Sequence, residues 1–235
     1  MGKRKDRRET SQRYARISQT VLQSALSADE DFGNHQDTPL TDTVLASSAQ
    51  LAGLVSQSQR RELPKMKKFR FQLLHQWIST HLEPGRVADV GGGKGLLSYL
   101  LQESGWSATV IDPIAQSLPT KYKELSSSKQ IHIPAAAQVP RMDCEFDPAM
   151  AQDFDLLVAM HAHGCNIQMV DAAAHFGCGV ILLPCCVIDE PIHPPPGMHW
   201  IQWLVEYVVA KGFVVEPFRL NFKGQNIGIY GRKMT

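Results

Sequence analysis

The stretch VADVGGGKG, at residues 87 to 95, places an acid and four glycines directly after an apolar run. The acid is Asp89, and the glycines are Gly91, Gly92, Gly93 and Gly95. Glycine has no Cβ atom, so a ligand can approach the main chain of such a loop more closely than side chains would allow. In open parallel sheets, ligands bind beyond the carboxyl ends of the strands, where this loop would lie. The stretch therefore predicts a binding loop for a nucleotide-like ligand.

Spacing separates three interpretations of this loop. A phosphate loop of the Walker type needs Gly-Lys followed by Ser or Thr, whereas Lys94 is followed by Gly95 and Leu96. A dinucleotide loop needs the pattern G-x-G-x-x-G, and its third glycine position falls on Leu96. The pattern D-x-G-x-G-x-G, in contrast, is met in full from Asp89 to Gly95.

A second acid follows at a distance that suits a ribose. Asp112 comes 21 residues after Gly91, in TVIDP at the end of the next predicted strand. A carboxylate there can accept hydrogen bonds from both ribose hydroxyls, as the acid about 20 residues after the loop does in dinucleotide folds. The other interpretation is a helix N-cap, because Asp followed by Pro is a common helix start. We favour the ribose.

Histidines and cysteines follow the two strands predicted at the centre of the sheet. His161, His163 and Cys165 alternate in AMHAHGC, so in a strand they would point the same way. Cys185 and Cys186 end the neighbouring strand. A histidine in this place could be the general base that takes a proton from the acceptor.

The same histidines and cysteines have two other interpretations. Together with His193 or His199 they could bind zinc, and alternatively they could pack and hydrogen-bond at the edge of the sheet. None of the spacings is C-x-x-C, so the pattern favours an acceptor site or packing over a metal site.

The elements that would position these residues alternate regularly from residue 66 onward. Apolar strands separated by helices predict an α/β fold of the Rossmann type, with a seven-stranded, mostly parallel sheet and helices on both faces. A tight turn at 224 and 225 joins the last two strands and predicts one late antiparallel strand. We predict helices at 67–82, 95–105, 116–127, 166–177 and 199–212, and strands at 86–90, 107–113, 131–133, 154–162, 179–187, 213–223 and 225–233. The PPPG run at 194–197 would form a stiff loop over the acceptor pocket.

We predict two parts, a polar helical extension at 1–63 and the main domain at 64–235. The extension is rich in Ser, Gln and Thr, with weak helical patterns on either side of a linker at 28–43. One basic cluster lies at 1–16, with seven basic side chains against two acidic ones, and another at 60–70, with six against one. Both clusters suit either solvated helix faces or phosphate binding.

The composition is that of an ordinary globular protein. The chain has 235 residues, 43% of them hydrophobic and 20% charged, and a net charge of +1. No window approaches 18 consecutive apolar residues and a polar stretch follows the N-terminus, so we expect no membrane span, no secretory signal and a cytoplasmic protein. Five cysteines, two of them adjacent, argue against a disulfide framework.

The loop, the second acid and the closing order of helix, strand, turn and strand resemble the class I S-adenosylmethionine-dependent methyltransferases over about residues 66 to 235. The resemblance implies S-adenosylmethionine as the cofactor, with the four glycines against it. It implies that Asp89 orients the ammonium of the methionine moiety and that Asp112 binds the ribose. Asp143 is the candidate for the adenine contact, and Asp147 is its rival.

The acceptor side distinguishes between branches of this family. Enzymes of this fold that methylate exocyclic amines of bases carry Asn or Asp, then Pro-Pro and an aromatic residue, where this chain has AMHAHGC. That difference argues against base N-methylation. The chain also resembles methyltransferases, some of them linked to RNA modification, that have His-Ala-Cys-Gly after the fourth strand and Cys-Cys after the fifth. Here His163 takes the place of the cysteine before the glycine.

We therefore predict an S-adenosylmethionine-dependent methyltransferase with His161 and His163 as its catalytic residues. We expect RNA as the acceptor, because the two basic clusters would contact phosphates independently of base sequence. A small-molecule acceptor is the first alternative and suits the near-neutral total charge. Further alternatives are a non-catalytic scaffold that binds a partner through residues 1–60 and a nicotinamide-dependent oxidoreductase.

Overall fold

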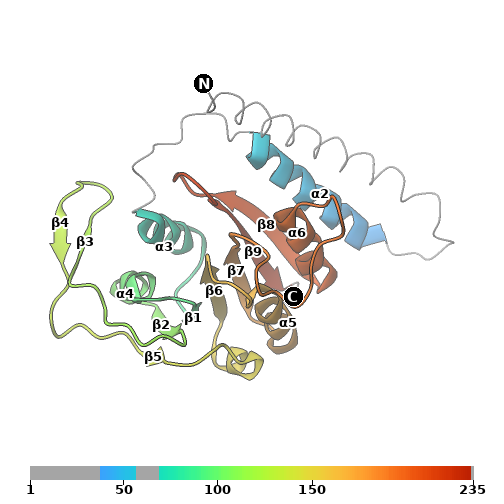
Figure 1. The fold of residues 1–235 in the computed structure, drawn as a ribbon. Coiled ribbons are helices and arrows are strands. Elements are labelled where there is room, and N and C mark those ends of the chain that lie inside the picture. The colour runs from blue at the N-terminus through green and yellow to red at the C-terminus, as the bar shows by residue number, and fades with distance from the viewer. Residues whose placement is uncertain (1–37, 57–68, 234–235) are drawn as a thin grey trace.

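One seven-stranded sheet forms the centre of the protein, whose computed structural model describes residues 38–56 and 69–233 (Figure 1). Its strands are β1 (Arg86–Val90), β2 (Ser107–Ile111), β5 (Arg141–Met142), β6 (Leu156–Met160), β7 (Gly179–Leu183), β8 (Phe213–Arg219) and β9 (Ile227–Lys233). They lie in the order β5-β2-β1-β6-β7-β9-β8. The first five of these run parallel, whereas β9 is antiparallel to both of its neighbours. The predicted fold class and the late antiparallel strand are confirmed.

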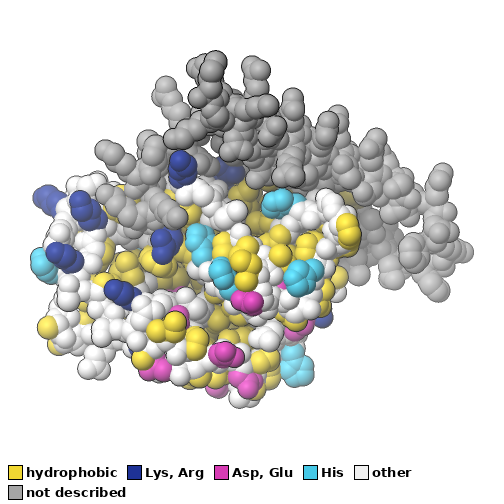
Figure 2. Space-filling model, viewed as in Figure 1, with side chains coloured by type: hydrophobic (Ala, Val, Ile, Leu, Met, Phe, Trp, Pro, Cys, Tyr) yellow, Lys and Arg dark blue, Asp and Glu magenta, His cyan; other side chains and the backbone are white. Residues whose placement is uncertain are grey.

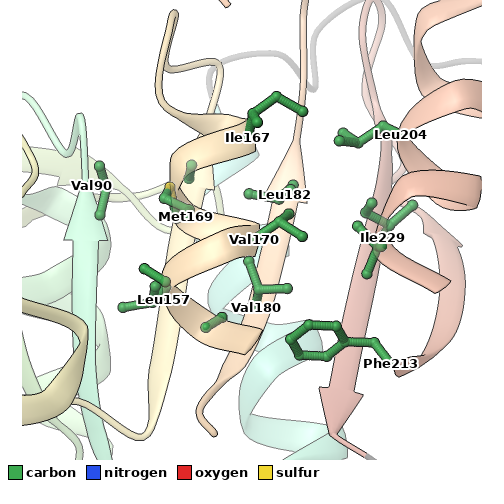
Figure 3. Close-up of a cluster of buried hydrophobic side chains, with 14 of the residues drawn as sticks. Val90, Leu157, Ile167, Met169, Val170, Val180, Leu182, Leu204, Phe213 and Ile229 are labelled. Atoms are coloured by element: carbon green, nitrogen blue, oxygen red, sulfur yellow. The ribbon is translucent and has the colours of Figure 1, made fainter. Parts of the chain in front are cut away.

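Helices cover both faces of this sheet. They are α2 (Thr38–Ser56), α3 (Arg70–His81), α4 (Leu96–Glu103), α5 (Asn166–Phe176) and α6 (Trp200–Ala210). Strand β6 is buried throughout, and its side chains alternate between two cores because successive residues of a strand point to opposite faces. Leu156 and Val158 pack with α3 and α4, whereas Leu157 and Ala159 pack with α5 and α6. Figure 3 shows Leu157 in this second core. Apolar side chains on both faces explain why the strands are apolar throughout.

Helix α2 packs on the edge of the sheet, against β8 and α6. Leu51 is buried there, and the hydroxyl of Ser47 donates a buried hydrogen bond of 3.0 Å to the carbonyl oxygen of Val215. The linker predicted at 28–43 is therefore wrong from Thr38 onward, where α2 begins. Proline at position 39 suits the first turn of a helix, whose N–H groups have no partner in the helix.

Several predictions for the N-terminal part fall outside the described residues. These are the first helical pattern, the basic cluster at 1–16, most of the cluster at 60–70 and the boundary at residue 63. Among the helices that are described, none has both the length and the apolar character needed to cross a membrane.

The segment between β2 and β6 differs most from the prediction. Strands β3 (Lys121–Lys123) and β4 (Gln130–His132) pair in a separate antiparallel hairpin, so the helix predicted at 116–127 is wrong. Pro119 lies in that stretch, and proline disfavours the helical conformation of the residue before it. Tyr122 instead packs against Tyr99 and Leu100 of α4. The strand predicted at 131–133 forms part of this hairpin, and β5 takes its place in the main sheet.

Candidate functional site

The glycine loop joins β1 to α4 at the carboxyl end of the sheet. Gly91, Gly93 and Gly95 have φ angles of +66°, +55° and +76°, which other residues rarely adopt. A Cβ atom on Gly91 would lie 2.7 Å from the Cβ of Ala162, and one on Gly92 would lie 2.6 Å from Oδ2 of Asp89. Conformation therefore requires glycine at positions 91, 93 and 95, and space requires it at 91 and 92.

Asp89 lies buried at the end of β1, beneath this loop. Its side chain is 2% exposed, and Oδ2 accepts a hydrogen bond of 2.9 Å from the hydroxyl of Ser98. Burial raises the pKa of Asp89 to about 6, against the hydrogen bonds from Ser98, which lower it. Burial disfavours the ionised form of a carboxyl group, so a positively charged ligand beside Asp89 would restore its charge.

Asp112 connects the glycine loop to the loop after β2. The carboxylate accepts hydrogen bonds from the backbone N–H of Gly93 at 2.8 Å and from that of Ile114 at 2.9 Å. No helix begins in the residues that follow, so the N-cap interpretation of Asp112 is wrong. Each carboxylate oxygen has two lone pairs, which leaves Asp112 able to accept further hydrogen bonds from a ligand.

Arg141 of β5 binds the same two loops from the other side. Its guanidinium donates hydrogen bonds of 2.7 Å to the carbonyl oxygen of Gly93, 3.1 Å to that of Ile114 and 3.1 Å to Oδ1 of Asp143. The sequence prediction missed Arg141, because no strand was predicted at β5 and its acceptors Gly93 and Ile114 lie 48 and 27 residues earlier. Three acceptors fix the guanidinium and, with it, the shape of the loop.

A cavity of about 420 Å³ lies beside this cluster of hydrogen bonds. Arg141 and Asp143 line it together with Lys94 of the glycine loop and Gln116. Asp143, the predicted adenine contact, therefore lies next to the glycine loop. Its rival Asp147 caps a short 3₁₀ helix, η4 (Pro148–Asp153), where Oδ1 accepts a hydrogen bond of 2.8 Å from the N–H of Ala149.

The predicted alternation of His161, His163 and Cys165 is wrong, because β6 ends at Met160 and these residues lie in a loop. His161 has a φ of +60°, and its Nε2 lies 2.8 Å from the carbonyl oxygen of Gln225. Cys165 lies at the start of α5, where burial raises the pKa of its thiol to about 12. The loop thus directs its side chains to three different places.

His163 lies against the two adjacent cysteines that follow β7. Its Nε2 is 3.0 Å from Sγ of Cys185, and the two sulfur atoms of Cys185 and Cys186 are 3.5 Å apart. The structure therefore brings together three of the five predicted residues. His199 lies elsewhere and caps α6, its Nδ1 accepting from the N–H of Ile201.

Two contacts position the histidine loop. Ala162, between the two histidines, is the residue that a Cβ on Gly91 would strike, so this loop adjoins the glycine loop. Glu190 is 4% exposed and accepts hydrogen bonds from the N–H of Asn166 and of Ile167 at 3.1 Å. The sequence prediction missed Glu190, because no pattern pairs an acid with a helix start that comes 24 residues earlier.

Sequence comparison gives one partial relative. No family model matches this chain. A stretch of 104 residues, 44% of the chain, is 28% identical to a protein of Caenorhabditis elegans described as a probable tRNA (uracil-O(2)-)-methyltransferase. The match spans 18% of that protein's length.

Solved structures with a similar arrangement include several methyltransferases. The 1,6-didemethyltoxoflavin-N1-methyltransferase of Burkholderia thailandensis has a TM-score of 0.45 and 13% identity, over 81% of this chain and 89% of that one. The ribosomal protein L11 methylase of Lactobacillus delbrueckii subsp. bulgaricus has a TM-score of 0.41 and 20% identity, over 70% of this chain and 77% of that one. Because both TM-scores are below 0.5, the fold is assigned from the strand order of this chain alone. Its own strand order and its D-x-G-x-G-x-G loop give the chain the fold of the class I S-adenosylmethionine-dependent methyltransferases.

Proposed function

We propose that this protein is an S-adenosylmethionine-dependent methyltransferase that modifies RNA. The observation that carries the methyltransferase activity is the buried Asp89 beneath a loop with four glycines. A neighbouring cation would stabilise the ionised form of the buried Asp89, and the ammonium of the methionine moiety is such a cation. The loop offers no Ser or Thr after Lys94 for a metal-bound phosphate, and this cofactor has no phosphate.

The other cofactor contacts follow from the same loop. The four glycines leave room for the amino acid tail and the ribose, Asp112 accepts hydrogen bonds from the ribose hydroxyls, and Asp143 lies on the adenine side. Arg141 positions the loop through Gly93. When bound, S-adenosylmethionine supplies a methyl group on a sulfonium, so the protein has mainly to position the acceptor and remove its proton.

His161 takes that proton in this proposal. A carbonyl oxygen only accepts hydrogen bonds, so the Nε2 that faces Gln225 carries the proton and Nδ1 holds the lone pair. The strained backbone at φ +60° places this ring directly after β6, next to Ala162 and the glycine loop. His163, the second predicted catalytic residue, also borders the acceptor side, but its Nε2 faces the thiol of Cys185.

The choice of RNA is supported by charge on the β3–β4 hairpin. Lys121, Lys123 and Lys129 are all exposed, and Tyr122 between the first two packs inward against α4. Lys and Arg atoms gather over this side of the molecule, whereas acidic atoms gather around η4 (Figure 2). Such a surface contacts phosphates without reading bases. The partial relative in Caenorhabditis elegans, described as a probable tRNA methyltransferase, supports the same acceptor.

Methyl transfer from labelled S-adenosylmethionine tests this proposal. Purified protein is incubated with a cell extract, and half of each sample is treated with ribonuclease before precipitation. We expect precipitable label that the nuclease removes and that Asp89→Asn does not produce. Label that stays soluble would identify a small-molecule acceptor instead. The absence of any label, with no binding of S-adenosylhomocysteine, would refute the methyltransferase itself.

A double variant of the β3–β4 hairpin tests whether its lysines contact RNA. Lys121→Gln with Lys123→Gln should raise the KM for RNA and reduce the salt dependence of binding by about two phosphate contacts. The affinity for S-adenosylhomocysteine should not change. Lys211→Gln is the matched control. Lys211 lies at the end of α6, on the face of the sheet opposite to α4 and the hairpin, and forms an ion pair with Asp171 of α5. An equal rise in KM for the control would exclude a specific role of the hairpin.

A further inference from the structure

A cluster of two thiols and one imidazole lies at the carboxyl ends of β6 and β7. It consists of His163, Cys185 and Cys186, and we call it the thiol–imidazole cluster. One nitrogen and two sulfur atoms, one from each residue, all lie within 4.8 Å of one another. His163 comes from the loop after β6 and the cysteines from the segment after β7, so the cluster connects two parts of the chain that are 22 residues apart.

The local geometry turns both cysteines to the same side. Adjacent side chains in a strand point to opposite faces, which would separate the two sulfur atoms. Strand β7, however, ends at Leu183, Pro184 follows, and the sulfur atoms of Cys185 and Cys186 come within 3.5 Å of each other. Tetrahedral zinc with bonds of about 2.3 Å to sulfur and about 2.1 Å to nitrogen sets its ligand atoms about 3.5 to 3.8 Å apart. Two of the separations are 3.0 and 3.5 Å, and all three ligand atoms lie within 4.8 Å of one another, so side-chain shifts of about 1 Å would bring them to these distances.

The kinds of ligand select the metal. Two thiols and an imidazole are the donors that zinc prefers, and the cluster contains no carboxylate of the kind that magnesium or calcium requires. His163 is exposed and both cysteines are partly exposed, so a fourth ligand can reach the metal from solvent. Three protein ligands and one open position are typical of catalytic rather than structural zinc sites. We propose that His163, Cys185 and Cys186 bind one zinc ion whose fourth ligand is water or the acceptor.

Such a site would stabilise the acceptor side of the protein. The metal would join the loop after β6 to the segment after β7, and Ala162 of that loop lies against Gly91. His161, two residues before His163, would be held in the same loop. Metal binding itself depends neither on methyl transfer nor on RNA, so it can be tested separately from the proposed function.

Cobalt serves as a spectroscopic substitute for zinc in the test. Full-length protein is freed of metal by a chelator and titrated with Co²⁺ under reducing conditions, and the zinc content of protein purified without chelator is measured in parallel. We expect one equivalent of metal per chain, with thiolate-to-cobalt absorption in the near ultraviolet that Zn²⁺ displaces. Cys185→Ser and Cys186→Ser should each weaken binding by at least about 100-fold, because even the loss of an outer partner of a metal ligand costs 10- to 100-fold.

A third cysteine provides the matched control. Cys144 is a partly exposed free thiol near β5, outside the cluster, and Cys144→Ser should keep the full cobalt spectrum. Wild-type protein without thiolate absorption, or Cys185→Ser with an unchanged spectrum, would refute the site. Because the wild-type titration alone decides whether metal binds, a variant that fails to fold does not prevent a result. Zinc binding by a protein that transfers no methyl group would refute the proposed function and leave this inference intact.

Discussion

Replacing Asp89 by asparagine tests the physical role of the buried carboxyl group. Burial raises the pKa of Asp89 from its ordinary value of 3.8 to about 6. A raised pKa means that the folded chain binds the proton more tightly than the unfolded chain does. The stability that protonated Asp89 contributes is therefore complete below about pH 4 and is lost as the pH rises through about 6. One pKa unit corresponds to about 1.4 kcal/mol, so ionised Asp89 costs the folded state about 3 kcal/mol at pH 7.

Asparagine has nearly the same shape, cannot ionise, and its side-chain oxygen still accepts the hydrogen bond from Ser98. Asp89→Asn should therefore raise the free energy of unfolding at pH 7 by up to about 3 kcal/mol and change it little at pH 4. Urea unfolding at both pH values measures this difference. The same variant should bind S-adenosylhomocysteine about 10- to 150-fold more weakly in calorimetry, because a hydrogen bond to a charged group contributes about 1.5 to 3 kcal/mol.

Ser98→Ala is the matched control, since it keeps the carboxyl group and removes its hydroxyl donor. This variant should lower stability at pH 7, the opposite sign from Asp89→Asn, because it removes one of the two hydrogen bonds that Ser98 donates to the buried carboxylate. If Asp89→Asn were no more stable than wild type at pH 7, or if its advantage did not depend on pH, the argument from burial would be wrong. Unchanged affinity for S-adenosylhomocysteine would instead remove Asp89 from the cofactor site.

Three further pairs of substitutions test other parts of the site. Gly91→Ala and Gly105→Ala impose a similar backbone strain of about 1 kcal/mol, so both should lower the free energy of unfolding in urea. Only the new methyl group at position 91 would strike a neighbour, Ala162, so only Gly91→Ala should lower the rate of methyl transfer. Arg141→Ala should weaken S-adenosylhomocysteine binding at least about 10-fold in calorimetry, because the glycine loop loses a charged donor, whereas Arg86→Ala removes an exposed ion pair and should leave affinity unchanged. His161→Gly should be about 1 kcal/mol more stable than His161→Ala, since glycine adopts a φ of +60° without strain. Both variants should lower turnover without changing cofactor affinity. Equal stability of the two would show that the backbone is not strained.

Local patterns were sufficient for six of the seven strands of the sheet and for the glycine loop, whereas β5 was not predicted. Strands β1, β2, β6 and β7 are short, mostly apolar and followed by a loop, and burial on both faces imposes that pattern on the sequence itself. Gly91, Gly93 and Gly95 have φ angles in the left-handed region, a property of the turn itself, so their spacing predicts the loop. The close approach of Ala162 to Gly91, in contrast, comes from a distant part of the chain. Asp89 is the fourth of the five residues of β1, and Asp112 directly follows β2.

The hairpin at β3 and β4 shows where local patterns fail. Residues 116–127 include enough helix-forming side chains to predict a helix, but Tyr122 gains more by packing on Tyr99 and Leu100, which come earlier in the chain. Tertiary contacts outweigh propensities of a few tenths of a kcal/mol per residue. The same reason makes α2 begin at Thr38, within the predicted linker, since its partners β8 and α6 lie about 150 residues further along the chain.

The sequence alone predicted the fold class and the turn formed by the glycine loop, because each depends on neighbours in the chain. Only the tertiary structure decided which histidines and cysteines meet. His163 joins Cys185 and Cys186, whereas His161 turns to Gln225 and Cys165 lies at the start of α5. That division depends on where β6 and β7 end and on how two loops meet across the edge of the sheet, which no periodicity in the sequence records.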